Sequence, residues 1–370
     1  MHKPIAPQSL SAVIRRNWRD TSEALGIGAV GGLLFGWLGL PAGYLSGAML
    51  AVALASLFGR PLKVPAPVMH ITSAIIGITL GSVATPGLMH GLGAYPVSLA
   101  VLGASTAAVV FASAFYLRAV HRWDALSSIL AATPGGLSQM VALAIETKSD
   151  AVGVSIAQTL RVVLLVAFLP VVLAFAGYSL GASGLPRVPM ATPSSLLILV
   201  AGSLLIGYGF FRLRFPGGWL FGAMFGSGLL HGFSIVDGGL PPTIVSAATI
   251  GVGAMAGTRF AGLGLQTLLR YLAAGAGSLA VAVLVMTGFL LLDIWIVGIR
   301  VQDGAMSFAP GAMDVMMTVA LTMHLDPVFV GAHHLFRFLA VSVVMPFVIR
   351  AVAPKVEDRP KAEDLPESEI

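Results

Sequence analysis

Two arginines lie within strongly apolar segments, where a charged side chain is unexpected. Arg161 and Arg337 each follow an aspartate, Asp150 or Asp326, by 11 residues. On a helix that rises 1.5 Å per residue, each guanidinium lies about 16 Å beyond its aspartate, close to the middle of a bilayer. A charge at that depth usually faces a cavity and marks the path of a substrate or ion. We predict that both arginines hold negative charge on a small molecule.

Two Pro-Gly sequences interrupt apolar segments at matched positions. Proline removes a helix hydrogen bond and suits the first turn of a new helix, so each break predicts two half-helices. Irregular backbone in lipid is tolerated only where it is buried or lines a cavity, and the positive N-terminal end of a half-helix suits an anion. We predict a substrate site at these breaks, with simple proline kinks as the alternative. The residues assigned to it are Pro134, Gly135, Gly136, Gln139, Pro310, Gly311 and Asp314.

The sequence also allows a structural role for Arg161 and Arg337. Each arginine can bind backbone carbonyls that a nearby helix break leaves free, or pair with an acid. Asp314 is the only acid inside a broken segment. It is predicted to bind a cation or a proton, with pairing to Arg337 as the alternative. Both uses of an arginine need the same buried geometry, so these alternatives stay open.

A histidine pair, His333 and His334, precedes Arg337 by one helical turn, and Gln158 occupies the position of His334 in the first half. His333, at position i−4, is expected on the same face as Arg337 and is included in the predicted substrate site. Such a pair on an apolar helix is more often hydrogen-bonded packing than a metal site, and no second cluster has ligand spacing. We predict no catalytic residue, no metal and no cofactor.

Membrane helices must position these residues. Of the 370 residues, 57% are hydrophobic and only 10% are charged, with no cysteine. A soluble domain carries about 25% charged residues, so this composition excludes an ordinary soluble enzyme. The fold class predicted is an all-α, polytopic transmembrane bundle of about 10–12 segments, each of about 20 apolar residues. The apolar segments are 22–40, 42–59, 66–83, 94–118, 125–147, 150–178, 192–211, 217–232, 242–258, 265–298, 302–323 and 326–350.

The two halves of the chain match each other at a distance of about 175 residues. At a separation of 176, Asp150 meets Asp326, Arg161 meets Arg337, and prolines also coincide. Chance similarity between apolar segments rarely aligns charged residues, so we predict two internal repeats with broken helices. The domains predicted are a cytoplasmic N-terminal segment 1–21, repeats 22–180 and 192–352, a linker 181–191 and a polar C-terminal tail 353–370.

The orientation of the repeats stays open. Six spans per repeat would make them parallel, whereas five spans and a re-entrant hairpin would make them inverted. With twelve spans, Arg60 and Lys63 fall on the side of the basic N-terminus but Arg212 and Arg214 fall opposite, so the positive-inside bias disappears in the second half. We predict a multi-pass protein of the bacterial inner membrane with a cytoplasmic N-terminus.

Glycines recur at four-residue spacing along several predicted helices. Examples are Gly28-x3-Gly32-x3-Gly36 and Gly253-x3-Gly257. Small residues on one face allow membrane helices to approach closely, so packing within the chain is predicted. A homodimer interface is the alternative.

The sequence resembles a known family in its duplicated motifs. These motifs are Leu40-Pro41-Ala-Gly43 with Gly47-Ala-Met49, Pro134-Gly-Gly-Leu137 with Met140, and the string Asp326-Pro-Val-Phe-Val-Gly-Ala-His-His-Leu-Phe-Arg337. They are similar to the AbrB family of polytopic membrane proteins, whose members carry labels such as ammonia monooxygenase or regulator. The resemblance covers about Leu25 to Val352. This family often has an acid where Gln139 stands here.

The function predicted is that of a secondary transporter for an anionic or zwitterionic small molecule. Its partners are the lipid bilayer and a small-molecule or ion substrate, without nucleic acid, and a homodimer is possible. Neither metal ligands, cofactor motifs nor a DNA-reading module occur in the sequence, so an enzyme is not predicted. The second alternative is a membrane sensor with an indirect effect on gene expression. A monooxygenase, as the family label implies, comes third.

Overall fold

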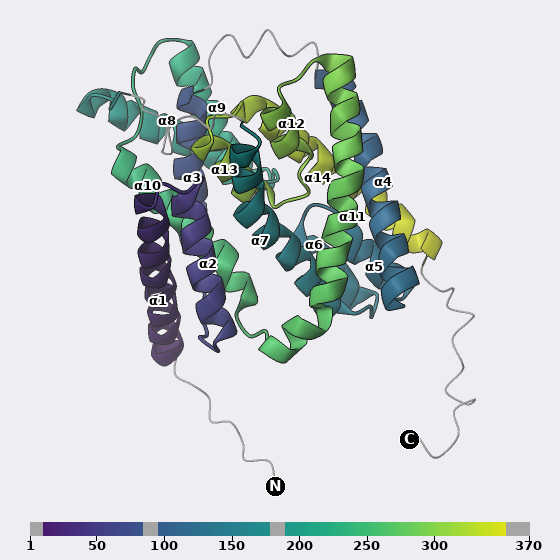
Figure 1. Cartoon of the computed structure of the whole chain (residues 1–370). Helices are drawn as coiled ribbons and strands as arrows, with labels where there is room; N and C mark the ends of the chain where they lie inside the picture. Colours follow the sequence, from purple (N-terminus) through teal and green to yellow (C-terminus); the bar gives the residue numbers. More distant parts are fainter. Residues whose placement is uncertain (1–9, 84–94, 178–188, 353–370) are drawn as a thin grey trace.

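The computed structural model describes residues 10–83, 95–177 and 189–352, which form a bundle of helices (Figure 1). This part of the chain contains fourteen α-helices, one short 3-10 helix and no strand other than an isolated bridge between Met190 and Gly239. The all-α prediction is confirmed. The predicted tail 353–370 and most of the predicted linker 181–191 lie outside the described residues.

The helices divide into two sets of seven. The first set is α1 (Leu10–Trp37), α2 (Gly43–Leu57), α3 (Ala66–Val83), α4 (Tyr95–His121), α5 (Ala125–Ala132), α6 (Leu137–Glu146) and α7 (Ala151–Phe175). The second set is α8 (Pro193–Arg212), α9 (Gly218–Gly232), α10 (Pro242–Gly257) with η2 (Thr258–Phe260), α11 (Leu265–Val297), α12 (Val301–Phe308), α13 (Met313–Thr322) and α14 (Pro327–Val352). Helix α1 begins within the segment that was predicted to precede the first span.

Several helices of the second set begin at a constant distance from their counterparts in the first. Each of α10, α12, α13 and α14 begins 176 positions after α3, α5, α6 and α7, as Val301 does after Ala125. Helices α4 and α11 end at the same separation, at His121 and Val297. Below, residues 176 positions apart are called equivalent.

Helices α4 and α11 lie side by side and run in opposite directions (Figure 1). Ser98, near the start of α4, contacts Asp293, near the end of α11. Further along α4, Ser113 donates a hydrogen bond to the carbonyl of Ser278, which is earlier in α11. Since α4 and α11 occupy equivalent positions, the two sets of helices are arranged in opposite senses.

Helices α5 and α6 form a hairpin, named hairpin 1. Tyr271 and Gly275 of α11 contact Asp150 and Ala157 around α7 in the same order, so α7 runs parallel to α11 and opposite to α4. The chain therefore enters hairpin 1 at the end of α4 and leaves it at the same end of the bundle.

Hairpin 2, made of α12 and α13, lies at the opposite end of the bundle (Figure 1). Ser98 and Gly103 of α4 contact His333 and Phe336 of α14 in the same order, so α14 runs parallel to α4. Helix α14 is thus opposite in direction to α11, and hairpin 2 also returns to the end where it began. With helices of 8 and 10 residues, neither hairpin is long enough to cross and return through the whole bundle.

Glycines bring helices into backbone contact, both within the first set and between the two sets. A Cβ added to Gly47 of α2 would overlap the carbonyl oxygen of Gly31 in α1. A Cβ added to Gly257 of α10 would lie 2.6 Å from the carbonyl oxygen of Met49 in α2. Likewise, Gly77 of α3 packs on the backbone of α9. These glycines pack helices within the chain, as the sequence predicts.

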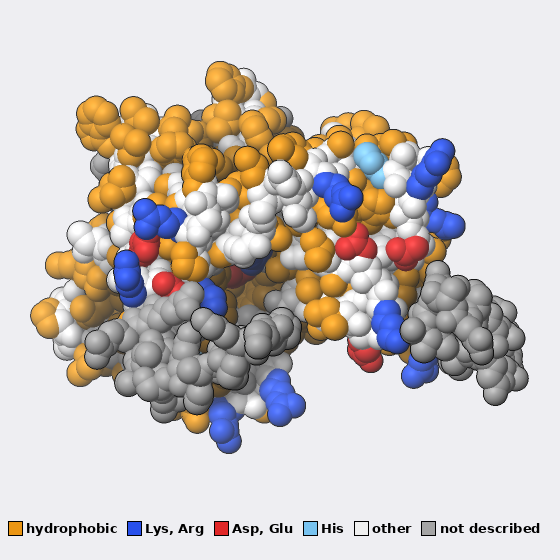
Figure 2. Space-filling model, turned by 90° about the horizontal axis from the view of Figure 1, so that it is seen from below, with side chains coloured by type: hydrophobic (Ala, Val, Ile, Leu, Met, Phe, Trp, Pro, Cys, Tyr) orange, Lys and Arg blue, Asp and Glu red, His pale blue; other side chains and the backbone are white. Residues whose placement is uncertain are grey.

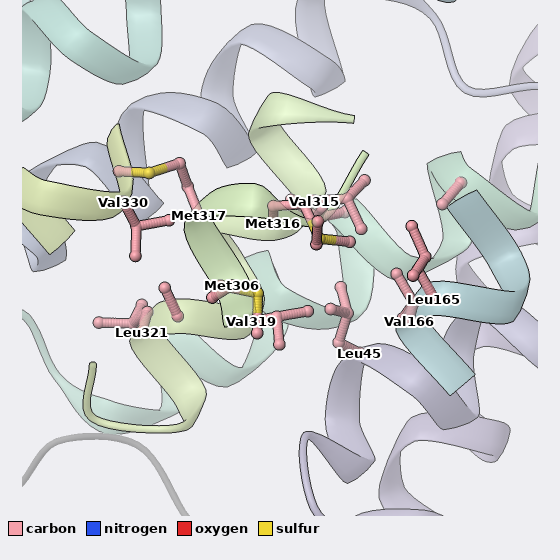
Figure 3. Close-up of a cluster of buried hydrophobic side chains, with 14 of the residues drawn as sticks. Leu45, Leu165, Val166, Met306, Val315, Met316, Met317, Val319, Leu321 and Val330 are labelled. Carbon is pink, nitrogen blue, oxygen red and sulfur yellow. The ribbon is translucent and has the colours of Figure 1, made fainter. Parts of the chain in front are cut away.

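The largest buried cluster surrounds hairpin 2. Figure 3 shows Met316 and Val319 of α13 packed with side chains of α2 and α7. From Val315 onward, every residue of α13 is buried, whereas α6 of hairpin 1 buries only Met140 and Ala144. Hairpin 2 is therefore held in the core, while hairpin 1 is more exposed.

The outer surface of the bundle is apolar. In the described residues, five helices are long and apolar enough to cross a membrane. They are α4, α7, α8, α11 and α14. Large apolar side chains such as Phe111, Leu284 and Phe347 are exposed on them. Exposed apolar surface on this scale indicates contact with lipid, and the chain is a membrane protein by these criteria.

The close glycine contact between α1 and α2 leads to a stability prediction. Replacing Gly47 by Val places a branched side chain against the backbone of α1, and we expect a loss of at least about 2 kcal/mol in the free energy of unfolding. Thermal unfolding of the purified chain in detergent measures it. Gly209→Ala in α8 is the control, since nothing lies within 4 Å of its added Cβ, and its effect should stay within about 1 kcal/mol. Equal losses would contradict the packing role.

Candidate functional site

Each hairpin has an irregular tip between its two short helices. Helix α5 ends before Thr133, and α6 begins after Gly135 and Gly136, whose φ angles are +110° and +51°. These angles suit glycine, which has no Cβ to clash with the backbone. The second tip lies between Ala309 and Ala312, where Pro310 and Gly311 are buried. The breaks predicted from the Pro-Gly sequences are therefore present as hairpin tips.

Arg161 of α7 binds the carbonyl end of α5. Its Nη1 donates to the carbonyls of Ala131 and Ala132 at 3.4 and 3.1 Å, and its Nη2 donates to Thr133 at 3.0 Å. The last carbonyls of a helix have no intrahelical partner and carry partial negative charge. A buried guanidinium supplies both the missing donors and the opposite charge.

Arg337 of α14 does the same for hairpin 2. Its Nη1 donates to the carbonyl of Phe308 at 3.1 Å, and its Nη2 donates to that of Ala309 at 2.9 Å. Both arginines are at least 95% buried, with exposed fractions of 5% for Arg161 and 3% for Arg337. The geometry thus favours the structural alternative left open by the sequence, in which each arginine binds carbonyls freed by a break.

Gln158 and His334 hold these arginines in the same way. The amide of Gln158 donates to the carbonyl of Leu130 at 2.8 Å, and its Oε1 accepts from Arg161 at 3.0 Å. At the equivalent position, Nε2 of His334 donates to Met306 at 3.1 Å, and Nδ1 accepts from Arg337 at 2.7 Å. This pair of contacts defines a neutral imidazole with its hydrogen on Nε2. A glutamine and a histidine are interchangeable here because each offers one donor and one acceptor.

His334, and not His333, makes the hydrogen bond to Arg337 among the described contacts, although the sequence interpretation placed His333 in the site. His334, at position i−3, contacts Arg337, whereas His333 contacts Ser98 of α4 and the carbonyl of Phe329. Residues at i−3 and i−4 both neighbour a helical residue, and only the packing of α14 between α4 and α12 decides which one turns toward Arg337.

The other predicted residues lie near the tips without forming one closed site. Oε1 of Gln139 accepts a hydrogen bond from Ser342 of α14 at 3.2 Å. Asp314 lies in the first turn of α13 and is half-buried. Among the described residues, Asp314 forms no ion pair with Arg337. In the same residues, no group of three or more His, Cys, Asp or Glu side chains could hold a metal ion.

Aspartates cap the helices that carry the arginines. Oδ1 of Asp150 accepts from the amide of Gly153, and Oδ1 of Asp326 accepts from that of Phe329. Burial raises the pKa of the Asp326 carboxyl, and the nearby charge of Asp303 adds to this, while the backbone donors oppose it. These caps fix the start of α7 and α14 against the first helix of each hairpin.

A groove of about 990 Å³, which the sequence did not predict, reaches Arg337. It lies between α4, α5 and α14, and its lining includes the buried Thr133 and Arg337 and the exposed Arg118 and Arg122. Most of its other lining residues are apolar. Because its walls combine the consecutive helices α4 and α5 with α14, which is distant in the sequence, no local pattern could have found it.

The equivalent region on the other side of the two arginines is closed. Thr106 and Val110 line the groove and are half-exposed, whereas their equivalents Ala282 and Met286 are buried. Gly275 of α11 packs on α7 beside Leu160. The described structure is therefore open beside Arg337, whereas the positions equivalent to Thr106 and Val110 are packed on the side of Arg161.

Residues 44–353 match the family model described as transition state regulatory protein AbrB. The chain belongs to the AbrB family. It is 24% identical over 346 residues to the uncharacterized protein YhjN of Bacillus subtilis (strain 168), covering 87% of this chain and 90% of that protein. It is also 24% identical over 326 residues to the "Putative regulator AbrB" of Escherichia coli (strain K12), covering 85% and 92%.

The matched region of this AbrB-family chain contains both hairpins, both buried arginines and all residues that line the groove. The resemblance identified from the sequence motifs is thus confirmed. The family description itself concerns regulation, and no residue role follows from it.

The shared role of Gln158 and His334 predicts which substitution is tolerated. His334→Gln keeps one donor and one acceptor, so we expect it to change the free energy of unfolding by less than about 1 kcal/mol. His334→Leu leaves Arg337 and the carbonyl of Met306 each short of a partner and should cost about 1–3 kcal/mol. Thermal unfolding in detergent compares the two variants. Equal destabilisation by both would show that the hydrogen bonds of His334 are unimportant.

Proposed function

We propose that this AbrB-family protein is a secondary transporter that exposes its central site alternately to the two sides of the membrane. One observation carries the proposal, namely that the groove beside Arg337 is open while the equivalent region beside Arg161 is closed. A bundle made of two similar halves can exchange these two states by a small rearrangement, so that each half takes the conformation of the other.

Repeated contacts support an inverted duplication as the basis of this exchange. Arg161 and Arg337 bind equivalent carbonyls, Gln158 and His334 orient them, and Asp150 and Asp326 cap equivalent helices. Equivalent helices α4 and α11 run in opposite directions. This is the relation expected for repeats related by a two-fold axis in the membrane plane.

An inverted arrangement also restores the positive-inside rule. If both hairpins are re-entrant, ten helices cross the membrane, and most basic residues fall at the end of the bundle where α4 ends. Figure 2 shows Lys and Arg side chains spread over this face. Arg300, between α11 and α12, lies at the opposite end. The basic residues at the first end include Arg60, Lys63, Arg118, Arg122, Lys148, Arg212, Arg214 and Arg259. We assign this end to the cytoplasm of a bacterial inner membrane.

The groove favours an organic anion with a sizeable apolar part. Its walls are mostly apolar, which suits a hydrocarbon or aromatic body. Arg161 and Arg337 are buried and close enough for their positive charges to repel each other. In the described residues, neither arginine forms an ion pair with an acid. Arg337 uses two of its guanidinium nitrogens for the hairpin and the histidine, and it still lines the groove, where an anion would balance the excess charge.

A ligand sensor is the second candidate, because the Escherichia coli relative carries the name of a regulator. A sensor would use the same groove to bind the anion but would not carry it across the membrane. The proposal includes no catalysis, metal or nucleic-acid binding. Flux distinguishes the transporter from the sensor.

A topology experiment tests the inverted arrangement. The natural chain has no cysteine, so single-cysteine variants report cleanly on access. Leu213 and Ile235 are exposed in the loops after α8 and α9. We expect a membrane-impermeant thiol reagent to label Leu213→Cys only from the cytoplasm and Ile235→Cys only from outside. Twelve spans in parallel repeats predict the reverse pattern, which would overturn the inverted arrangement.

A transport experiment tests the proposed substrate class. The full chain is reconstituted in liposomes, and uptake of radiolabelled benzenesulfonate, naphthalenesulfonate or sulfate, which are permanently charged, is measured. We expect the aromatic anions to be taken up and Ala340→Trp, which fills the groove, to reduce the rate of uptake at least about tenfold. The control is Val343→Trp, since Val343 lies on the exposed face of α14 and does not line the groove. Binding of these anions without uptake would support the sensor instead.

A further inference from the structure

A buried polar cluster lies between α4, α11 and α14, and it is separate from the residues that Arg161 and Arg337 contact. Ser98, Asp293 and His333 each have an exposed fraction of 0%. Oγ of Ser98 lies 2.6 Å from Oδ2 of Asp293 and 2.7 Å from Nε2 of His333. Nδ1 of His333 lies 2.7 Å from the carbonyl oxygen of Phe329. We call these three side chains the Ser98–Asp293–His333 cluster.

Counting hydrogens restricts the protonation of this cluster. A carbonyl oxygen can only accept, so Nδ1 of His333 carries a hydrogen. The contacts on the two sides of Ser98 need one hydrogen each, and the hydroxyl supplies only one. The second must come from Asp293 as an acid or from Nε2 of a protonated His333. If neither Asp293 nor Nε2 of His333 carries a hydrogen, one of the two short contacts joins two acceptors. If both carry one, three hydrogens compete for the two contacts of Ser98.

We propose that the Ser98–Asp293–His333 cluster is a binding site for one exchangeable proton. In one state, the acid form of Asp293 donates to Oγ of Ser98, which donates to Nε2 of His333. In the other state, the proton of Asp293 has passed to Ser98 while the hydroxyl proton has passed to His333, so the total charge is unchanged. The distances are those of direct hydrogen bonds and leave no space for a metal ion between the atoms.

Other titratable groups surround the cluster. The ring of Tyr95 in α4 lies 6.4 Å from that of His333, and Tyr95 is close enough to Asp303 and Asp326 to interact with their charges. His333 is likewise close enough to Arg337 to interact with its charge. The hydroxyl of Tyr95 and Oδ1 of Asp293 are buried and have no hydrogen-bond partner among the described residues.

The equivalent contact in the other half of the molecule is apolar, which argues against a purely structural role. Three helices, α4, α7 and α11, meet there through side chains of one buried hydrophobic cluster. The residues at the equivalent positions are Leu117, Ala157 and Ala274. The fold therefore forms this contact without polar groups. Because buried polar groups are costly compared with apolar ones, their presence at one of the two contacts indicates a function.

The proton site and its link to transport are separate claims. The site follows from the contacts of the cluster alone. Its coupling to anion movement rests on the proposed function, and adjacency supports it, since His333 is followed directly by His334, which binds Arg337. Taken together, the two claims mean that the anion crosses the membrane with a proton that binds to the cluster.

Spectroscopy of the full chain in detergent tests the proton site directly. Infrared spectra report whether Asp293 is an acid, and nitrogen NMR of histidine-labelled protein reports whether Nε2 of His333 carries a hydrogen. Asp293→Asn and His333→Gln assign the two signals. We expect one of the two groups, and not the other, to be protonated at neutral pH. Protonation of both groups or of neither would overturn the proposal.

A triple variant copies the apolar contact of the other half. Ser98→Ala, Asp293→Leu and His333→Ala together should fold with a thermal midpoint at least equal to that of the natural chain. Upon alkaline titration with a pH-sensitive dye, the triple variant should release one proton fewer than the natural chain. The control is Ser113→Ala, which removes another buried hydrogen bond between α4 and α11 and should release as many protons as the natural chain. Unchanged release from the triple variant would overturn the proton site.

Coupling is tested by uptake of the aromatic sulfonates into liposomes under an imposed pH gradient. One proton moving with one sulfonate carries no net charge, so uptake of the anion is measured instead of a current. We expect the gradient to increase uptake by the natural chain and by Ser113→Ala, and to have no effect on Asp293→Asn. Uptake that ignores the gradient in the natural chain would overturn the coupling while the spectroscopic site stands. Absence of any uptake overturns the proposed transport function and leaves the proton site to the spectroscopic result.

Discussion

The binding of backbone carbonyls by two buried arginines is the interaction on which this structure depends. A hairpin that ends inside an apolar bundle exposes the carbonyl ends of its first helix where no water can reach them. Arg161 and Arg337 satisfy these carbonyls and oppose the partial negative charge of the helix ends. Each guanidinium in turn needs support, which Gln158 and His334 provide. The tips, the arginines and the helices that carry them therefore form one connected unit in each half.

Two such units meeting inside one bundle leave positive charge in its middle. The halves have the same contacts but not the same packing, because hairpin 2 is held in the largest hydrophobic cluster and hairpin 1 is more exposed. In the part of the chain that the structure describes, a groove reaches the side of Arg337. The proposed alternating access rests on this difference in packing between two similar halves.

The differences between the halves are as informative as their likeness. Where equivalent positions both carry Arg, Asp or a residue with one donor and one acceptor, the fold needs that chemistry. The positions equivalent to Ser98, Asp293 and His333 instead hold apolar residues of a buried cluster. A position that the fold can fill with alanine or leucine, but that holds a buried acid, is retained for a reason other than packing. This comparison within one chain separates structural polar groups from functional ones.

The sequence by itself determined the all-α membrane class, the matched halves and the positions of the breaks, because apolar spacing and Pro-Gly pairs act locally. It also singled out Arg161 and Arg337, since a charge in an apolar segment is recognisable without neighbours. Only the tertiary structure decided what they bind, that His334 and not His333 faces Arg337, and that Asp293 meets Ser98. These outcomes depend on how helices distant in the sequence rotate and pack against each other, and no spacing along one chain segment specifies that rotation.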